Sequence, residues 1–258
     1  MAEIFGKEEK FVKRILLQGA MDSELSYYME QECFRSVRVV SRNGFEFQVS
    51  RQGEKEIILS KTGMGMTNAA LATMTAVTEF HPDVILNQGT AGAHVKSLKR
   101  GDMVIGRQAV NVHSLEMTKR DFGEGMVPEQ WKGMATEYID ADKELVRWFE
   151  QEMGVETRTG KVVTGILGSG DLFSKEKDRI LWLHEKFGNL SEDMETFAVY
   201  AACRACCIPC VAIRVISNNE LLDEDYDEYT AVKLQRVIWS ILKKGKKNPV
   251  SFDSEPEK

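Results

Sequence analysis

Three short stretches place carboxylates and amides where the chain changes direction. Glu24 follows a strand-like run in GAMDSE, Met194 and Glu195 stand in EDMETFAVY, and Asn218 follows the apolar run CVAIRVIS. A carboxylate can take up a proton or accept bonds from two hydroxyl groups, whereas an amide both donates and accepts. These residue types suit acid–base chemistry on a polar small molecule.

Glycines follow three of the strand-like runs. GAMDSE comes after RILLQ, GTAGAH after VILNQ, and GSGDLF after VVTGIL. In sheets with parallel strands, ligands bind outside the carboxyl ends of the strands, so we expect these three loops and the ISNN segment to line one pocket. Taken singly, each glycine is explained equally well by a tight turn.

Strand-like and helix-like patterns alternate along the chain. The runs RILLQG, FEFQVSR, EIILSK, DVILNQG, DMVIGRQAV, VVTGIL and CVAIRVIS predict strands. Helices are predicted over Ser23 to Gln31, Thr67 to Phe80, Asp142 to Met153, Lys175 to Lys186, Glu192 to Ala205 and Tyr226 to Lys244. The alternation is typical of a layered α/β fold with helices on both sheet faces. We expect one domain over residues 1–245 and a loose polar tail over 246–258.

Composition narrows the class of partner. The 258 residues carry a formal net charge of -6 without a strong basic block, which disfavours nucleic-acid binding and favours a small-molecule ligand. No apolar run is long enough for a membrane span, and the N-terminal stretch MAEIFGKEEKFVKR is too charged for a secretory signal. We therefore expect a cytoplasmic protein that binds neither nucleic acid nor membrane.

The cysteines raise a metal hypothesis. Four of the five crowd into CRACCIPC, with two CxxC spacings. The segment joins a helix end to an apolar strand, where cysteine packs as a small hydrophobe, and no second Cys or His cluster completes a zinc site. We predict no metal and no cofactor.

Six motifs occur in a familiar order. GAMDSE, SKTGMGMTNAA, PDVILNQGTAGA, SGDLF, EDMETFAVY and VISN resemble the nucleoside phosphorylase/uridine phosphorylase superfamily, and most closely its 5'-methylthioadenosine/S-adenosylhomocysteine nucleosidase branch. The resemblance extends over about residues 13 to 245. It implies a three-layer α/β/α fold with a mixed central sheet, and an enzyme that hydrolyses the N-glycosidic bond of a 5'-modified purine nucleoside.

The resemblance also implies roles for residues around the sugar. Glu24 matches the glutamate that activates the attacking water, and Thr90 matches a hydroxyl residue near that nucleophile. Met194 and Glu195 match the ribose-binding pair, and Met21 lies in the same loop as Glu24. Phosphorylase relatives carry an arginine in this loop, so the acidic GAMDSE favours hydrolysis over phosphorolysis.

Further positions are matched around the base and the 5'-group. Phe173 aligns with the aromatic residue that stacks on the purine, and Ser174 follows it where relatives often carry an aliphatic residue. Phe122 in FGEGMVP and Tyr226 in DEDYDEYTAV resemble residues that line the 5'-substituent pocket. Relatives lend the loop of the first across a dimer interface, so we expect a homodimer. His113, Ser114 and Glu116 precede this loop in a segment slightly longer than the usual one, and we assign them no catalytic role.

Asn218 is the main departure from the family pattern. Nucleosidases acting on methylthioadenosine carry an aspartic acid there, which protonates the leaving purine, and an amide cannot supply that proton. Relatives that act on 6-oxopurine nucleosides, such as futalosine hydrolases, resemble this chain in having asparagine. Inosine-like or futalosine-like substrates are therefore one alternative, and a catalytically weak nucleoside-binding protein is another. Glu220 or Asp223 could replace the missing acid, although both also fit a solvated acidic loop.

Overall fold

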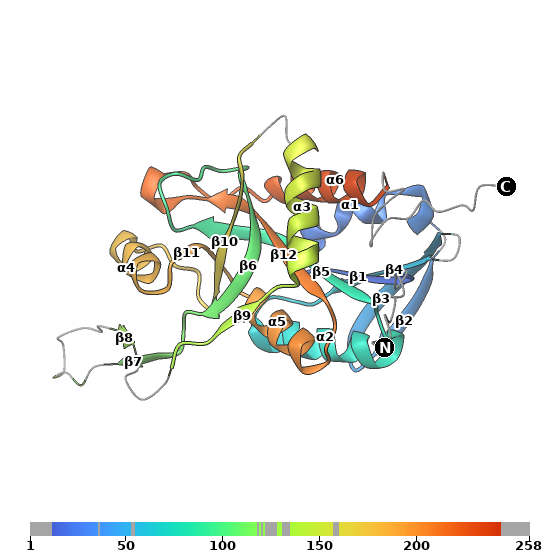
Figure 1. The fold of residues 1–258 in the computed structure, drawn as a ribbon, viewed down its shortest axis with the longest axis horizontal. Coiled ribbons are helices and arrows are strands. Elements are labelled where there is room, and N and C mark those ends of the chain that lie inside the picture. Colours follow the sequence, from blue (N-terminus) through green and yellow to red (C-terminus); the bar gives the residue numbers. More distant parts are fainter. Residues whose placement is uncertain are drawn as a thin grey trace, which may run out of the picture.

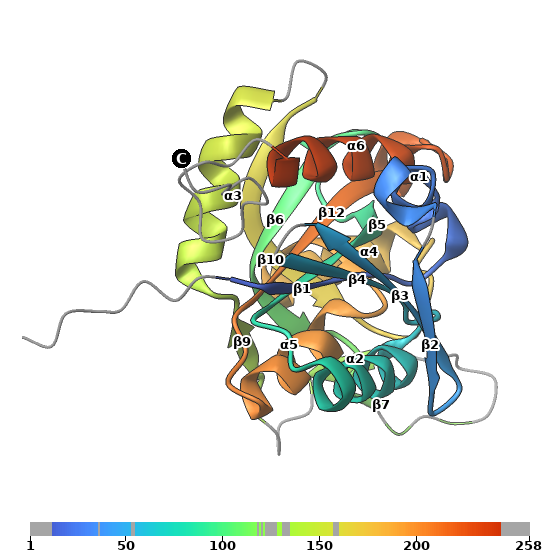
Figure 2. The ribbon, with the colours of Figure 1, turned by 90° about the vertical axis from the view of Figure 1, so that its right-hand side faces the viewer.

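The computed structural model describes residues 12–35, 37–52, 55–117, 119, 121, 128–130, 135–156 and 160–243. A central mixed sheet lies between helices on both faces, so the predicted three-layer α/β/α architecture is confirmed (Figures 1 and 2). The strands are β1 Arg14–Gly19, β2 Arg38–Arg42, β3 Phe45–Gln52, β4 Lys55–Lys61, β5 Val84–Ala93, β6 Met103–Asn111, β7 Leu115–Met117, β8 Pro128–Gln130, β9 Tyr138–Asp140, β10 Val162–Ser169, β11 Asn189–Asp193 and β12 Cys210–Asn218.

Two properties of the sheet position the candidate site. β1 is parallel to β4 and β5, and β12 is parallel to β5, so the ends of β1, β5 and β12 lie together. β11 pairs with both β10 and β5, which closes β5, β12, β6, β10 and β11 into a barrel-like ring. The short strands β7 and β8 form a separate hairpin.

Helices cover the two faces of the sheet. α2 Met66–Phe80 packs beside α5 Thr196–Ala205 on one face, and α6 Thr230–Lys243 lies on the other with α1 Ser26–Met29 and α3 Lys143–Glu156 (Figure 2). α4 Lys177–Phe187 lies next to β11. α6 illustrates the cause, because it buries one apolar stripe against the sheet, including Leu234, Ile238 and Leu242.

Three predicted helices are wrong in extent, and one of them, predicted from Tyr226, starts only at Thr230. The segment predicted as one helix over Ser23 to Gln31 consists of a 3₁₀ turn, Asp22–Glu24, and the four-residue α1, followed by the 3₁₀ turn Glu32–Phe34. The helix predicted from Glu192 starts only at Thr196, because Asn189–Asp193 pair as a strand with neighbours on both sides. β2, β7, β8, β9 and β11 were not predicted.

The core is built from the apolar strands, with one buried cation in it. Arg214 in β12 is 1% exposed, and the other residues from Cys210 to Ile216 are apolar. Cys203 and Cys210 are buried free thiols, and the described part of the chain contains no group of three His, Cys, Asp or Glu residues placed to hold a metal ion.

None of the helices described has the length and apolarity needed to cross a membrane. The predicted tail 246–258 lies outside the described residues.

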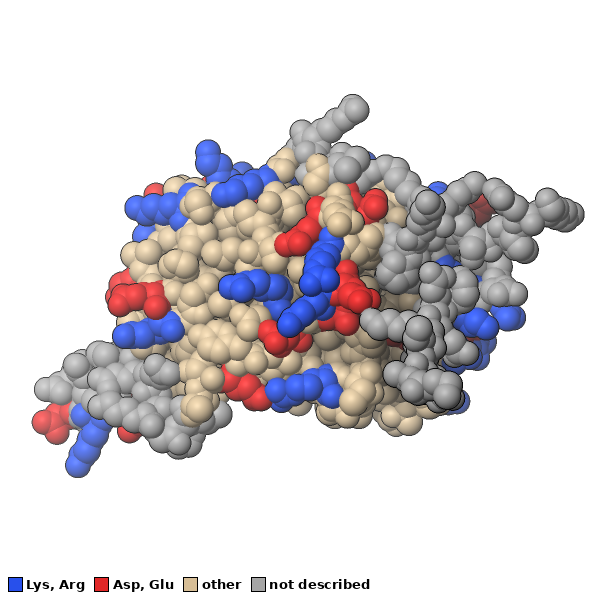
Figure 3. All heavy atoms as spheres, viewed as in Figure 1, with Lys and Arg blue, Asp and Glu red and all other residues tan. Residues whose placement is uncertain are grey.

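The visible surface is mixed in charge. On the face shown in Figure 3, lysine and arginine side chains are interspersed with aspartate and glutamate. This pattern differs from the single-sign stripe that tracks a phosphate backbone.

Candidate active site

A cavity of about 410 Å³ lies where several strand ends meet. The loops after β1 and β10, the end of β5, the segment around the start of α5 and the tip of β12 all contribute to its wall. The lining residues are Ala20, Met21, Glu24, Met64, Thr90, Ala91, Gly92, Ala93, His94, Leu172, Phe173, Ser174, Ile180, Glu192, Asp193, Met194, Glu195, Ser217, Asn218, Glu220 and Tyr226. The three glycine loops and the ISNN segment thus line one pocket.

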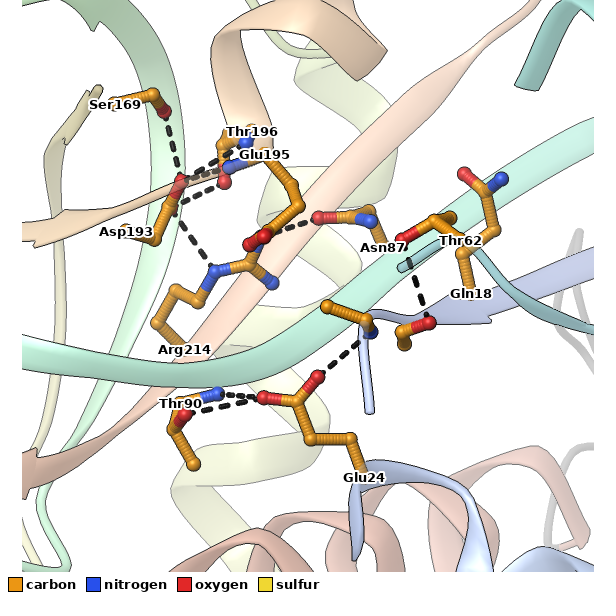
Figure 4. Close-up of polar contacts among 12 residues, drawn as sticks. Gln18, Glu24, Thr62, Asn87, Thr90, Ser169, Asp193, Glu195, Thr196 and Arg214 are labelled. Atoms are coloured by element: carbon orange, nitrogen blue, oxygen red, sulfur yellow. Dashed lines mark hydrogen bonds and ion pairs between the residues drawn. The ribbon is translucent and has the colours of Figure 1, made fainter. Parts of the chain in front are cut away.

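Glu24 is held rigidly at one side of this cavity. Its side chain is buried, and Oε2 accepts from the backbone N–H groups of Ala20 at 2.7 Å and Met21 at 3.3 Å. Oε1 accepts from the Thr90 backbone N–H at 2.7 Å and from Thr90 Oγ1 at 3.1 Å (Figure 4). Four donors therefore converge on two oxygens, as suits a carboxylate that only accepts.

Glycines make room for this carboxylate. A Cβ added at Gly89 would lie 2.7 Å from Glu24 Oε1, and one at Gly19 would lie 3.0 Å from Glu24 Cβ. Any larger residue at Gly89 must therefore displace the carboxylate, so the glycine that ends VILNQG is explained by close approach to Glu24.

A buried ion pair supports the opposite wall. Arg214 Nε lies 3.0 Å from Asp193 Oδ2, and Arg214 Nη2 donates to Asn87 Oδ1 at 2.5 Å (Figure 4). Asp193 Oδ1 also accepts from Ser169 Oγ and from the backbone N–H groups of Glu195 and Thr196, which anchors the residues at the start of α5. The pair fixes where α5 begins and hence where the next carboxylate points.

That carboxylate belongs to Glu195, which is 7% exposed and accepts from the Gly65 backbone N–H at 3.0 Å. Burial and then the charge of Asp193 raise the pKa of Glu195 to about 7, against the lowering influence of Arg214 and the Gly65 bond. Arg214 Nη2 lies 4.0 Å from Glu195 Oε2. Glu195 therefore changes charge near neutral pH.

The tip of β12 carries a β-bulge. The pairing of β12 with β5 shifts between Ile216 and Asn218, so that Ser217 is the extra residue. Asn218 is 2% exposed, and its amide would lie 3.3 Å from a Cβ added at Gly92. Bulges beside active sites redirect side chains, and here the bulge turns the Asn218 amide over Gly92.

Two aromatic side chains line the cavity, one from the loop after β10 and one from the segment between β12 and α6. Phe173 and Tyr226 are about half exposed and meet edge to face, with ring centroids 6.3 Å apart. Ser174 is partly buried, and its Oγ accepts from Arg179 Nε at 3.3 Å. The cavity is thus lined by aromatic rings as well as by carboxylates.

The structure brings together all but one of the candidate site residues. Glu24, Thr90, Asn218, Phe173, Ser174, Met194, Glu195, Met21 and Tyr226 all line the cavity. Phe122 lies outside the described residues. Of the two possible replacement acids, Glu220 lines the cavity, whereas Asp223 is exposed and pairs with Lys177 at 2.5 Å.

Sequence reasoning missed several residues of the site. Asp193 and Arg214 support Glu195, and His94 and Glu192 line the cavity. A lone arginine in an otherwise apolar strand is a usable signal, because a buried cation requires a buried anion. His113 also lies close, with its Nε2 3.5 Å from Glu192 Oε1.

A family comparison accounts for the motif order. The model of the phosphorylase superfamily matches residues 14–241. The chain belongs to this superfamily. Among curated members, a 5'-methylthioadenosine/S-adenosylhomocysteine nucleosidase from a Geobacillus species is 32% identical over 206 residues, which cover 80% of this chain and 85% of that protein.

Two solved structures share the fold of this chain. A futalosine hydrolase mutant from Helicobacter pylori superposes with a TM-score of 0.74 at 23% identity, covering 89% of this chain and 98% of that one. The 5'-methylthioadenosine/S-adenosylhomocysteine nucleosidase from Neisseria meningitidis, in complex with methylthio-immucillin-A, gives a TM-score of 0.74 at 24% identity with the same coverage. At these identities the likeness establishes the fold.

Proposed function

We propose that this chain is a purine nucleosidase that hydrolyses the N-glycosidic bond of a 5'-modified nucleoside. Glu24 takes a proton from a water molecule that attacks the anomeric carbon, the bond from that carbon to the base nitrogen breaks, and its electron pair leaves with the base. The products are the free sugar and, after the base takes a proton, the free purine. The sequence relatives named as nucleosidases support this class of reaction.

One observation carries the proposal. The Glu24 carboxylate lies in a cavity whose described lining contains several carboxylates and neither lysine nor arginine. The buried Arg214 is already committed to Asp193 and Asn87. A phosphate dianion requires cationic groups to hold it, so this environment favours water as the nucleophile. The same negative surroundings favour the positive charge that builds on the sugar ring in glycoside cleavage.

Glu195 and Met194 are proposed to bind the ribose. An ionised Glu195 accepts hydrogen bonds from both ribose hydroxyl groups, and Met194 offers an apolar surface to the ring. Thr90 Oγ1, at 3.1 Å from Glu24 Oε1, is positioned to share the attacking water. Glu24 and Glu195 both line the cavity, and the charge of Glu24 also raises the pKa of Glu195.

Phe173 and Tyr226 are proposed to enclose the nucleoside from the loop side. Phe173 stacks on the base, because an aromatic face suits a flat purine. Tyr226 and Met21 are assigned to the 5'-substituent, which is a thioether in the substrates that give the 5'-methylthioadenosine/S-adenosylhomocysteine nucleosidases their name. We further propose a homodimer in which Phe122 of the neighbouring subunit completes the 5'-pocket.

The test is a product assay with four nucleosides. Purified protein is incubated with 5'-methylthioadenosine, S-adenosylhomocysteine, inosine and futalosine, with and without phosphate, and released base and sugar are measured. The proposal predicts free base and free sugar at the same rate in both buffers for at least one substrate. Sugar 1-phosphate formed only with phosphate would replace hydrolysis by phosphorolysis, and no release from any nucleoside would refute the proposed function.

A further inference from the structure

A buried carboxylate that the proposed reaction does not use lines the same cavity as Asn218. Glu192 in β11 is 7% exposed and lines the cavity together with His94. In the sheet, Glu192 pairs with Gly92 from one side and Asn218 pairs with Gly92 from the other. Residues paired across neighbouring strands lie side by side, so the two polar side chains flank the bare backbone of Gly92.

Hydrogen bonds define which oxygen of Glu192 is engaged. Asn189 Nδ2 donates to the Ser191 carbonyl at 3.1 Å, which fixes the orientation of the amide, and donates to His94 Nδ1 at 2.9 Å. Since Nδ1 of His94 accepts, the ring proton is on Nε2, which donates to Glu192 Oε2 at 3.2 Å. His94 is thus a neutral donor to one carboxylate oxygen.

The other oxygen of Glu192 lacks a short hydrogen bond. Glu192 Oε1 is buried and has no well-aligned hydrogen bond among the described residues, since His113 Nε2 is 3.5 Å away. Burial would raise the pKa of Glu192, but the neighbouring polar side chains of His113, His94 and Ser174 bring it down to about 2. An ionised carboxylate with one poorly satisfied oxygen calls for a donor.

The Asn218 amide has the complementary orientation. Its Nδ2 donates to Glu220 Oε1 at 3.2 Å, and its Oδ1 accepts from Ser217 Oγ at 2.9 Å. A carboxylate only accepts, so Glu220 fixes the NH₂ end of the amide. The second Nδ2 hydrogen remains available to a ligand. Across Gly92 the protein therefore presents an acceptor on one side and a donor on the other.

We propose that Glu192 and Asn218 together select a 6-oxopurine as the base, which rests on the purine nucleosidase function proposed above. Glu192 Oε1 accepts from the N1–H group, and Asn218 Nδ2 donates to the six-position oxygen. Adenine carries a lone pair at N1 instead of a hydrogen, so an ionised carboxylate beside it is unfavourable. Hypoxanthine and guanine both have the required pattern of donor and acceptor.

The same pair explains how a chain without an acid at Asn218 can release its base. A departing 6-oxopurine carries its negative charge largely on the six-position oxygen, and the Asn218 N–H stabilises that charge as it develops. No proton has to be transferred from the protein to the base before the bond breaks. Glu220 is a positioning residue in this account, because it orients the Asn218 amide.

The test replaces the acceptor Oε1 of Glu192 by a hydrogen-bond donor. In Glu192→Gln the amide oxygen keeps the bond from His94, so the NH₂ group replaces Oε1 and matches the N1 lone pair of adenine. Catalytic efficiencies are compared for 5'-methylthioinosine and 5'-methylthioadenosine. The wild type should prefer the inosine derivative by about 10-fold or more, and Glu192→Gln should shift the ratio towards adenine by about 10- to 100-fold. The isosteric control Glu185→Gln, on the exposed side of α4, should leave the ratio unchanged.

The outcomes distinguish a failure of the base assignment from a failure of the nucleosidase function. A wild type that cleaves the adenine derivative equally well or better overturns the base assignment while leaving the nucleosidase function intact. So does a folded Glu192→Gln variant with an unchanged ratio. Cleavage of neither compound by the wild type refutes the proposed function for these substrates. Calorimetric binding of free hypoxanthine and adenine to the wild type gives a readout that needs no variant to fold, and tighter adenine binding also contradicts the inference.

Discussion

Ionisation of Glu195 should link the ribose site to the stability of the fold. Burial, followed by the charge of Asp193, moves its pKa from an ordinary 4.5 to about 7. A carboxyl whose pKa is raised on folding binds more protons in the native state than in the unfolded state between these two values. The free energy of unfolding therefore falls as pH rises from about 4.5 to about 7, at about 1.4 kcal/mol per pH unit, and then levels off. The total loss is about 3 kcal/mol.

Glu195→Gln removes this ionisable group while keeping an oxygen for the Gly65 N–H. We expect the variant to lack the Glu195 component of the pH dependence, so that at pH 8 relative to pH 5 it gains about 3 kcal/mol of unfolding free energy over the wild type. Urea denaturation at the two pH values measures it, with Glu185→Gln as the exposed isosteric control. Parallel pH dependences in wild type and Glu195→Gln would refute the reasoning.

The same ionisation should appear in catalysis. The wild-type catalytic efficiency should fall as pH decreases below about 7, because a protonated Glu195 accepts fewer bonds from the ribose hydroxyl groups. Glu195→Gln should be less active at every pH and should lack this acid limb. If Glu195→Gln is more stable than the wild type at pH 8 and also less active, then the ionised Glu195 that binds the ribose lowers the free energy of unfolding.

Two further substitutions probe the supports of the site. Gly89→Ala places a Cβ 2.7 Å from Glu24 Oε1 and should lower turnover, measured by steady-state assay, by about 10²-fold or more. The control Gly154→Ala places a Cβ that meets no atom within 4 Å, so it should retain both activity and the helix. Equal turnover in the two variants would contradict the role of this close approach. Arg214→Met leaves the buried Asp193 without its cation and should lower the free energy of unfolding by about 3–5 kcal/mol, and a change below about 1 kcal/mol in urea denaturation would contradict it.

Local patterns predicted the layered fold because apolar strands and amphipathic helices are encoded in short windows. They failed around the start of α5, where the NLSED segment forms β11 through pairing with β5 and β10. Both partners are distant in sequence, so no local signal reveals the strand. The ring closed by β11 also brings Glu192 and Asn218 to the two sides of Gly92, which explains why Glu192 could not be proposed from the sequence.

Some residues of the candidate site could be proposed from the sequence, whereas others are identified only by the assembled fold. Glu24, Glu195 and Asn218 follow strand ends or begin a helix and could be proposed from motifs. Arg214 lies inside a strand and acts through partners from β5 and β11, so only the assembled fold identifies its role. The low pKa of Glu192 likewise depends on histidines that follow β5 and β6.

Activation of water by Glu24 is the central claim, and Glu24→Gln tests it most directly. Single-turnover release of the base from the preferred nucleoside should slow by at least about 10²-fold, because an amide cannot take the proton from water, while the affinity for the free base, measured by calorimetry, should stay within about threefold. A variant that releases base at the wild-type rate would show that Glu24 does not activate the nucleophile.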